Sequence, residues 1–373
     1  MVVMIISIAT GTGLQKKITE KIISFTGDAQ IIPYVVSEYS GAYLPNADSI
    51  AGQLRGQDEI RHVQMVSEKG GLLKTEDDFE GITVKGVGND FDWRHFQTYL
   101  RSGRAPHYSL DDYNDSILVS EFLMRRLKLQ TGDEVVVFFL REAPQPPLMR
   151  QFLIAGTFAT GMAEFDGNHI IAHEKHLRKL NKWEVGSAGR LEIFLHESPP
   201  SLEWADQIRF ALPLNANLRL ARETYLDIFQ WIDLFDVNIY LILIVMIVVG
   251  LVNSVTALLT IILEKRRSIG LMKALGASEA QLRKLFQLRS MVIVGKGMLW
   301  GNLMGIGLCL IQQFTGWLRL DPEVYYVDQV PIHLPWLMLL ALNAGVLLIS
   351  YLAMNLPVRV IARMQAADSL KAF

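Results

Sequence analysis

VNIYLILIVMIVVGLVNSVTALLTIIL, residues 237–263, leads directly into EKRRSIGLMKALGA, residues 264–277. The first part has no charged side chain and is longer than the roughly 20 residues that a helix needs to cross ~30 Å of hydrocarbon. We therefore expect a membrane-spanning helix here. The basic cluster Lys265–Arg267 follows at its end. Because loops rich in Lys and Arg stay on the cytoplasmic side of a bilayer, the helix is predicted to leave the membrane on that side.

A short amphipathic helix is expected after the basic cluster. Apolar side chains recur at helical spacing at Ile269, Met272 and Leu275, and Gly276 is suited to end a helix in the left-handed conformation. Such a helix can dock a soluble partner, with Ile269 and Met272 facing it. The charges alone favour a plain topology signal. The amphipathic helix after them, together with the family signature described below, favours docking.

The composition indicates that membrane and soluble parts are segregated. The chain has 373 residues, of which 50% are hydrophobic and 20% charged, and most of the charge before residue 237 lies in residues 26–236. That region is long enough for one large soluble domain or two small ones. The net charge of −2 gives no sign of nucleic-acid binding. The single cysteine, Cys309, excludes an intramolecular disulfide and a lipid-anchored cysteine near the start.

Residues 26–236 are predicted to form an α+β domain with a mostly antiparallel sheet. β-rich runs occur at residues 29–36, 81–87, 116–120, 135–140, 150–158 and 189–197. Helices are expected in residues 120–133, at Glu174–Leu180 and at Leu202–Leu212. A further helix around Thr224–Phe235 should continue into the span that begins at Val237.

Two more apolar runs, residues 285–314 and 334–356, predict two more spans. The segment 264–284 holds six Lys or Arg against two Glu, whereas the loop 315–333 sets Arg319 against three acidic side chains. The first connection is therefore expected inside and the second outside. Counting back from these, the soluble domain lies outside the cytoplasm.

EKRRSIGLMKALGAS, together with Asn253 in the span before it, resembles the signature of a permease superfamily. This MacB/FtsX-like superfamily includes the lipoprotein-releasing (LolC/LolE-like) transmembrane subunits of ABC transporters, the macrolide-exporter permeases and the cell-division permease FtsX. Other motifs are similar to the lipoprotein-releasing subset. They are GTFATGMAEFD at residues 156–166, LDPEVYYVDQVPI at residues 320–332, and the tail residues Pro357, Arg359 and Leu370.

The resemblance implies a four-span α-helical permease with a large extracytoplasmic α+β domain between spans 1 and 2. Met1–Thr10 is apolar but would span only ~15 Å as a helix, so the chain is expected to begin inside a truncated first span. An interfacial helix is the alternative. The expected division is 1–25, first-span remnant and exit helix; 26–236, periplasmic domain; 237–263, span 2; 264–284, coupling helix; 285–314, span 3; 315–333, periplasmic loop; 334–356, span 4; and 357–373, cytoplasmic tail.

The chain is not expected to be an enzyme or to need a cofactor, because the phosphate-binding pattern GxxxxGK[ST] does not occur in it. The resemblance implies that a separate cytoplasmic ATPase grips the coupling helix. The residues that match this role are Glu264, Lys265, Arg267, Ile269, Gly270, Lys273 and Gly276.

Three histidines, His169, His173 and His176, suggest a metal site but lack the spacing of a helical HExxH pair. We expect them to be solvated on a helix, with no metal. Another pattern is more informative: Gly297, Gly301 and Gly305 recur every four residues and predict close helix packing, within the chain or across a dimer.

The proline-rich connection REAPQPPLMR, residues 141–150, separates two β-rich runs. The resemblance implies a possible contact with a soluble lipoprotein carrier at Pro146, Pro147, Leu148 and Met149. A plain hairpin loop is an equal alternative.

The expected function is that of a permease subunit in the bacterial inner membrane. It would extract acylated lipoproteins for transfer to a periplasmic carrier, driven by the ATPase. The partners would also include membrane lipids and a second permease subunit, identical or different, but no nucleic acid. The alternatives are an efflux permease of the macrolide-exporter type and an FtsX-like scaffold that activates a cell-wall hydrolase.

Overall fold

The computed structural model describes residues 1–34, 43–75, 78–108, 113–140, 145–321 and 325–354. The tail residues Pro357, Arg359 and Leu370 lie outside this part. The chain divides into two compact units. The helix unit comprises Met1–Lys17, Gln230–Leu320 and Gln329–Phe373, and the sheet unit comprises Ile18–Phe229 and Asp321–Asp328.

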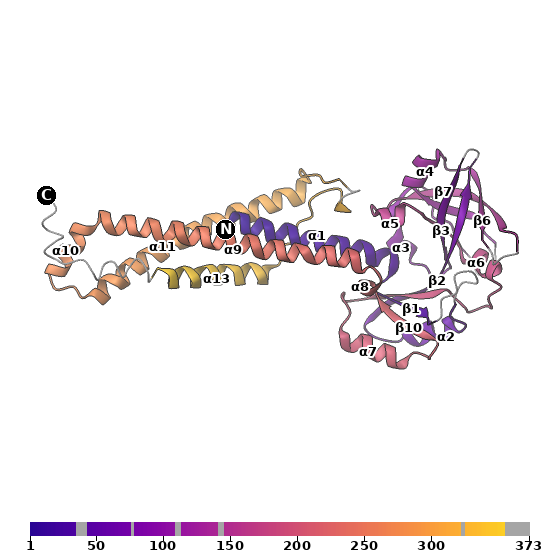
Figure 1. Cartoon of the computed structure of the whole chain (residues 1–373), viewed down its shortest axis with the longest axis horizontal. Helices are drawn as coiled ribbons and strands as arrows, with labels where there is room; N and C mark the ends of the chain where they lie inside the picture. Colours follow the sequence, from indigo (N-terminus) through magenta and orange to yellow (C-terminus); the bar gives the residue numbers. More distant parts are fainter. Residues whose placement is uncertain (35–42, 76–77, 109–112, 141–144, 322–324, 355–373) are drawn as a thin grey trace. The chain divides into compact units, whose positions relative to one another are not determined.

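The sheet unit is built on one ten-stranded sheet (Figure 1). Its strands are β1 (Ala29–Pro33), β2 (Ile60–Lys74), β3 (Phe79–Val87), β4 (Leu100–Gly103), β5 (Ser116–Ser120), β6 (Glu134–Phe139), β7 (Leu148–Phe158), β8 (His169–His173), β9 (Arg190–Leu195) and β10 (Ala216–Leu220). The order is β10-β1-β9-β2-β3-β8-β5-β7-β4, with β6 pairing β2 and β7. Only β3–β8 and β5–β7 are parallel among the described strand pairs, which confirms the mostly antiparallel sheet.

Short helices cover the sheet. They are α2 (Ala47–Leu54), α3 (Trp93–Phe96), the 3-10 turn η1 (Gln97–Tyr99), α4 (Glu121–Leu127), α5 (Ala163–Asp166), α6 (Glu174–Asn181), α7 (Leu202–Ala211) and α8 (Ala221–Thr224). The predicted helices correspond to α4, α6 and α7. Ser120 and Ser201 begin α4 and α7 by accepting a hydrogen bond from a backbone N–H three residues on, the usual role of an N-cap serine.

A buried ionic cluster holds the end of α1 (Val2–Thr26) against the sheet. The Lys85 ammonium lies 2.9 Å from Glu192, donates to the Phe25 carbonyl, and lies 4.3 Å from the centre of the Phe25 ring. Arg190 bridges Glu192 and Glu68. A cation is favourable here because the last carbonyls of a helix have no partner within it. Burial lowers the pKa of Lys85, and the Glu192 charge opposes this effect.

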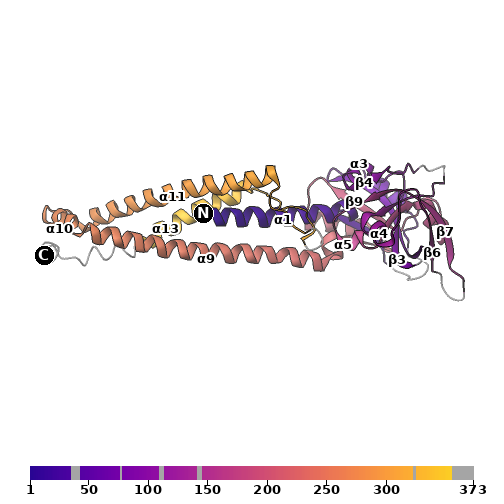
Figure 2. The same ribbon diagram turned by 90° about the horizontal axis from the view of Figure 1, so that it is seen from above.

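The helix unit contains the first part of α1 and four further described helices, α9 (Leu226–Glu264), α10 (Arg266–Ala274), α11 (Glu279–Thr315) and α13 (Trp336–Ala353). Three of the described helices, α9, α11 and α13, are long and apolar enough to cross a membrane. α9 and α11 contain the predicted spans 237–263 and 285–314, and α13 lies within the predicted span 334–356. α9 runs without a break through Val237, as expected. Four helices, α1, α9, α11 and α13, run along one another (Figure 2).

Side chains from all four of these helices pack together in the helix unit. Ile5, Ile239, Cys309 and Leu339 belong to one buried cluster. The amides of Asn302 on α11 and Asn343 on α13 hydrogen-bond each other at 2.7 and 3.2 Å. Such pairs satisfy polar groups that hydrocarbon cannot solvate.

Of the three glycines predicted to allow close helix packing, Gly301 and Gly305 do so, and Gly297 does not. A Cβ on Gly301 would lie 2.5 Å from the Met1 Cβ, and one on Gly305 would lie 3.1 Å from Ile5 Cδ1. Gly297 has open space around it. Two of the three glycines therefore allow α1 to approach α11 within one chain.

The expectation of solvated helix histidines is wrong. His169 and His173 lie in β8, and His173 and His176 are only 2% and 1% exposed. The rings of Tyr108 and Phe152 cover them, each at 4.9 Å between ring centres. Among the described residues, no group of His, Cys, Asp and Glu side chains is arranged to hold a metal ion.

Candidate functional site

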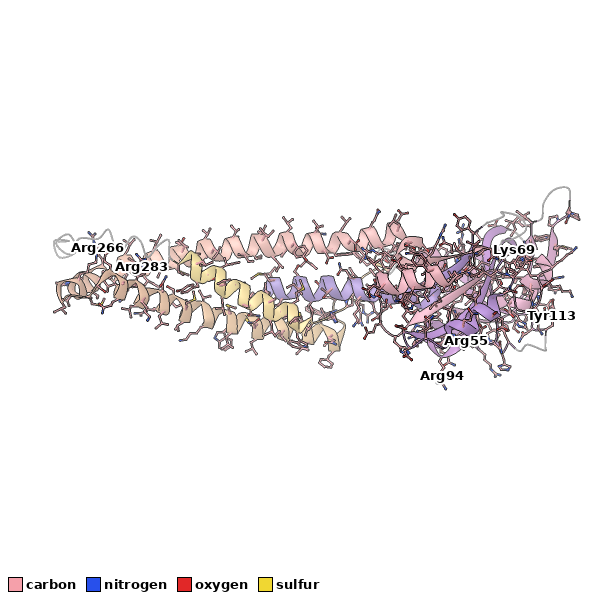
Figure 3. The ribbon with its side chains drawn as sticks, turned by 90° about the horizontal axis from the view of Figure 1, so that it is seen from below. Arg55, Lys69, Arg94, Tyr113, Arg266 and Arg283 are labelled. Atoms are coloured by element: carbon pink, nitrogen blue, oxygen red, sulfur yellow. The ribbon has the colours of Figure 1, made fainter. Side chains whose placement is uncertain are left out.

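The predicted coupling segment forms the compact end of the helix unit, where Arg266 on α10 and Arg283 on α11 are labelled in Figure 3. Gly276 follows α10 with φ +96°, the left-handed conformation expected of it. Ser278 then begins α11 with a capping box, in which its hydroxyl and the Gln281 side chain each pair with the other's backbone N–H. The turn between the two helices is therefore well defined.

Ile269 does not face outward, so the prediction that it faces a soluble partner is wrong. It is fully buried in a cluster with Leu258, Ile262, Leu282 and Phe286, and Met272 is half-buried against the same cluster. α10 thus packs this apolar side against α9 and α11. Its outward apolar side chains are Leu271 at 56% and Leu275 at 80% exposure.

The other predicted coupling residues differ in exposure, since some lie on the surface and some are covered. Glu264, Lys265, Arg267 and Gly276 are exposed, and Gly270 is buried. Lys273 is mostly covered and lies 3.5 Å from Glu279 across the turn. The surface that α10 offers thus combines basic side chains with two exposed leucines.

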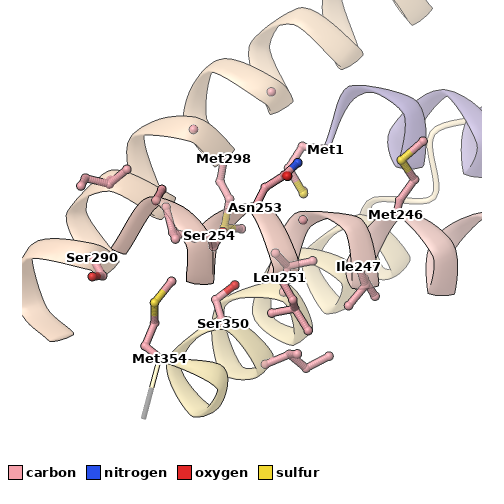
Figure 4. Close-up of a pocket in the computed structure, with 18 of the residues that line it drawn as sticks. Met1, Met246, Ile247, Leu251, Asn253, Ser254, Ser290, Met298, Ser350 and Met354 are labelled. Atoms are coloured by element: carbon pink, nitrogen blue, oxygen red, sulfur yellow. The ribbon is translucent and has the colours of Figure 1, made fainter. Parts of the chain in front are cut away.

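A cavity of 560 Å³ lies within the helix unit, between α1, α9, α11 and α13 (Figure 4). Most of its lining is apolar, including Met246, Leu251 and Met298. The polar lining comes from Asn253, Ser254, Ser290 and Ser350. Gly297 also borders it, which explains the open space around that glycine. The cavity can take hydrocarbon and a small number of polar groups.

An apolar strip lies on the sheet beside the proline-rich connection. Its members are Leu72, Phe79, Phe138 and Met149, and we call them the apolar strip. Phe138 is the register partner of both Leu72 and Met149, so the three side chains line up across β2, β6 and β7. Met149 is 61% and Phe79 58% exposed. Of the predicted carrier-contact residues, Pro146 and Pro147 are exposed, while Leu148 packs partly into the core.

Residues 160–166 form a tightly bonded loop at the end of β7. The Asp166 carboxylate accepts hydrogen bonds from the Thr160 N–H and hydroxyl, both at 2.9 Å, and from the Gly161 N–H at 2.8 Å. Gly161 has φ +71°. Burial raises the pKa of Asp166, and these hydrogen bonds and the Lys21 charge act against the rise.

The outer segment, residues 321–328, is described at Asp321 and at residues 325–328, and it contacts this loop through Tyr326. Lys21 Nζ donates to the Tyr326 carbonyl at 2.6 Å, and the Tyr326 hydroxyl donates to Glu164 at 2.9 Å. Val327 beside it is buried. The sequence did not predict these contacts, although both segments carry motifs of the family resemblance, because no local pattern links positions so far apart.

Residues 240–366 match the FtsX-like permease C-terminal family. The lipoprotein-releasing system transmembrane protein LolC of Xylella fastidiosa strain 9a5c is 22% identical, over 99% of this chain and 90% of that protein. LolE of Haemophilus influenzae is 30% identical over 147 residues, which are 37% of this chain and 35% of that protein. The periplasmic region of MacB from Actinobacillus actinomycetemcomitans is 14% identical, with a TM-score of 0.38, over 55% of this chain and 95% of that chain.

These matches agree with the expectation of a permease subunit rather than an enzyme. They also agree with the three helices of the described residues that can each cross a membrane. The chain is thus a multi-pass membrane protein that carries an FtsX-like permease C-terminal domain at residues 240–366 and is similar along nearly its whole length to lipoprotein-releasing transmembrane proteins.

Proposed function

We propose that this chain is the transmembrane subunit of an ATP-driven transporter that releases acylated lipoproteins from the bacterial inner membrane. The observation that carries the proposal is the similarity to a lipoprotein-releasing protein over 99% of the chain. In this proposal α1 belongs to a first span, so that four spans cross the membrane and the sheet unit lies in the periplasm. The basic end of α9 and the segment after it then lie in the cytoplasm.

A separate ATPase binds the exposed side of α10. Leu271 and Leu275 supply apolar contacts, and Lys265 and Arg267 supply positive charge. The burial of Ile269 holds α10 firmly against α9 and α11. When the ATPase displaces α10, α9 and α11 therefore move with it, and α10 does not simply bend away from them.

The substrate explains why energy is needed. An acyl chain is held in a bilayer by ~0.8 kcal/mol for each buried methylene group. The apolar cavity of the helix unit fits hydrocarbon, so it can shelter part of such a chain during extraction. A second permease subunit, identical or different, completes the path.

The carrier that receives the lipoprotein binds at the apolar strip and the adjoining residues Pro146 and Pro147. Phe79 and Met149 are exposed, and such neighbouring large apolar side chains are unusual on a water-facing surface that meets no partner. The strip offers them at the end of the β6–β7 hairpin.

The test is ATP-dependent release of a radiolabelled lipoprotein from proteoliposomes that contain the permease complex, with carrier in solution. Leu271→Asp and Leu275→Asp should each remove most ATPase from the purified complex and lower release roughly tenfold, since a carboxylate is costly in an apolar contact. Met149→Glu should keep the ATPase but lose release to the carrier. Leu214→Asp is the matched control, because Leu214 is fully exposed in the sheet unit. Wild-type behaviour of all three test variants would refute the proposal.

A further inference from the structure

The outer segment joins α11 to α13 along the chain, yet it belongs to the sheet unit. The chain leaves the helix unit after Leu320 and returns to it at Gln329. α1 and α9 each run from one unit into the other as continuous helices. α11 and α13 do not run into the sheet unit, and the chain that joins these two helices passes through it at the outer segment.

The base of the outer segment is fastened to the end of α11. Val330 N–H donates to the Leu318 carbonyl at 3.0 Å, closing the two arms of the loop. The buried Gln312 amide donates to both of these residues' carbonyls and accepts from the Leu318 N–H at 2.9 Å. The arms therefore move with α11.

The tip of the outer segment is fastened to the sheet unit through Tyr326. Its carbonyl and hydroxyl are held by Lys21 and Glu164. The backbone of Tyr326 has φ +59°, which a residue with a bulky side chain rarely adopts, so the contacts hold it against a local preference. Burial and the hydrogen bond to Glu164 raise the pKa of Tyr326 to about 12, and the hydroxyl therefore keeps its proton near neutral pH.

We propose that Tyr326 is a positioning residue of the transport cycle, which passes movement of α11 and α13 to the sheet unit through Glu164 and Lys21. The inference rests on the proposed function, because it assigns the movement to lipoprotein release. A loop fastened at its base and at its tip transmits displacement, whereas a loose loop absorbs it. Two residues, Glu164 and Tyr326, thus act as one contact.

The experiment uses spin labels at Glu203→Cys on α7 and Trp317→Cys beyond α11, in a Cys309→Ser background of the full complex. The change in label distance on adding ATP and vanadate is measured together with lipoprotein release. Tyr326→Phe and Glu164→Leu should each at least halve the distance change and lower release roughly threefold to tenfold, the effect of losing one solvent-exposed hydrogen bond of ordinary net strength. The double variant should be no worse than either single one.

Two variants serve as controls. Tyr325→Phe removes the hydroxyl of the preceding residue, which has no hydrogen-bond partner among the described residues. This variant should behave as wild type. Glu164→Gln keeps an acceptor oxygen and should retain most of the distance change. A merely structural role for Tyr326 would alter stability without altering the nucleotide-driven distance change.

The outcomes separate the two proposals. If the labels move in wild type but no lipoprotein is released, the proposed function fails and the role of Tyr326 in transmission stands. If Tyr326→Phe keeps both the distance change and release, the role of Tyr326 is overturned. The same holds if the wild-type labels do not move with nucleotide.

Discussion

His173 is a neutral histidine in the core of the sheet unit. Its ring stacks on Tyr108 at an angle of 6°, and only 2% of the residue is exposed. Burial, with the positive charges of Lys175, His176 and Arg178, lowers the pKa of His173 to about 4. In the unfolded chain its pKa returns to about 6.5.

This pKa difference predicts that the sheet unit loses stability in acid. Below pH 6.5 the unfolded chain binds a proton at His173, whereas the folded state binds it only near pH 4. The contribution of His173 to stability is therefore complete above pH 6.5 and is lost as the pH falls from 6.5 to 4. We expect the titration of His173 to lower the free energy of unfolding by ~2 kcal/mol between pH 7.5 and pH 5. Hydrogen exchange of β3 and β8 amides in the full chain, corrected for intrinsic rates, measures it.

The variant His173→Phe isolates this contribution, because it keeps a stacked ring that cannot titrate. It should lose stability less steeply than wild type between the same two pH values. Buried carboxyl groups such as Asp166 titrate equally in both proteins. Equal slopes for the two proteins would show that His173 takes up its proton as readily in the folded state as in the unfolded chain.

Single residues show where sequence patterns stop being informative. The spacing of Ile269, Met272 and Leu275 predicts a helix, and α10 forms there. Apolar side chains lie on both sides of so short a helix, and only the positions of α9 and α11 decide that Ile269 is covered and Leu271 is not. Similarly, nothing local to His176 indicates that Phe152 will cover it.

At the scale of elements, the packing of α1 on α11 depends on one face of α11. A Cβ at Gly305 would meet Ile5 at 3.1 Å and Val2 at 3.3 Å, whereas nothing lies within 4 Å of one at Gly307. Gly305→Ile should therefore destabilise the protein by ~1–3 kcal/mol through overpacking. Thermal unfolding in detergent measures the difference.

Gly307→Ile is the control for this prediction, since both variants change the helix propensity of α11 alike. It should unfold within a degree or two of wild type, an effect of under ~0.5 kcal/mol. If both isoleucines destabilise equally, then close approach of α1 is not what the glycine at position 305 provides.

Elements were predictable where one physical cause dominates. Long apolar runs predict α9, α11 and α13, because hydrocarbon accepts few polar side chains. The long strand β2 is absent from the prediction, because Ser67, Glu68 and Lys69 interrupt its apolar pattern. Glu68 is tolerated there only through its pairing with Arg190, more than a hundred residues later.

For the whole molecule, the topology gives a direct test. In a Cys309→Ser background, single cysteines at Asp115 and Asp328 should react with a membrane-impermeant thiol reagent in cells with a permeabilised outer membrane. A cysteine at Ser278 should react only after the inner membrane is opened, because the basic segment around it stays inside. All three positions are exposed, so burial does not limit labelling. Labelling at position 278 in unopened cells would reverse the topology.

The neighbouring positions of β1 and β10 in the sheet have an evolutionary consequence. Ala29 pairs with Leu220, so the chain enters and leaves the sheet unit at adjacent strands. The gene segment that encodes the chain between these two points can be exchanged by recombination, since a different domain with adjacent ends fits between the same two helices, α1 and α9. The exchange is constrained at one place. A newly acquired domain must bring its own partner for Tyr326, or the ancestral tyrosine loses the carboxylate that it holds.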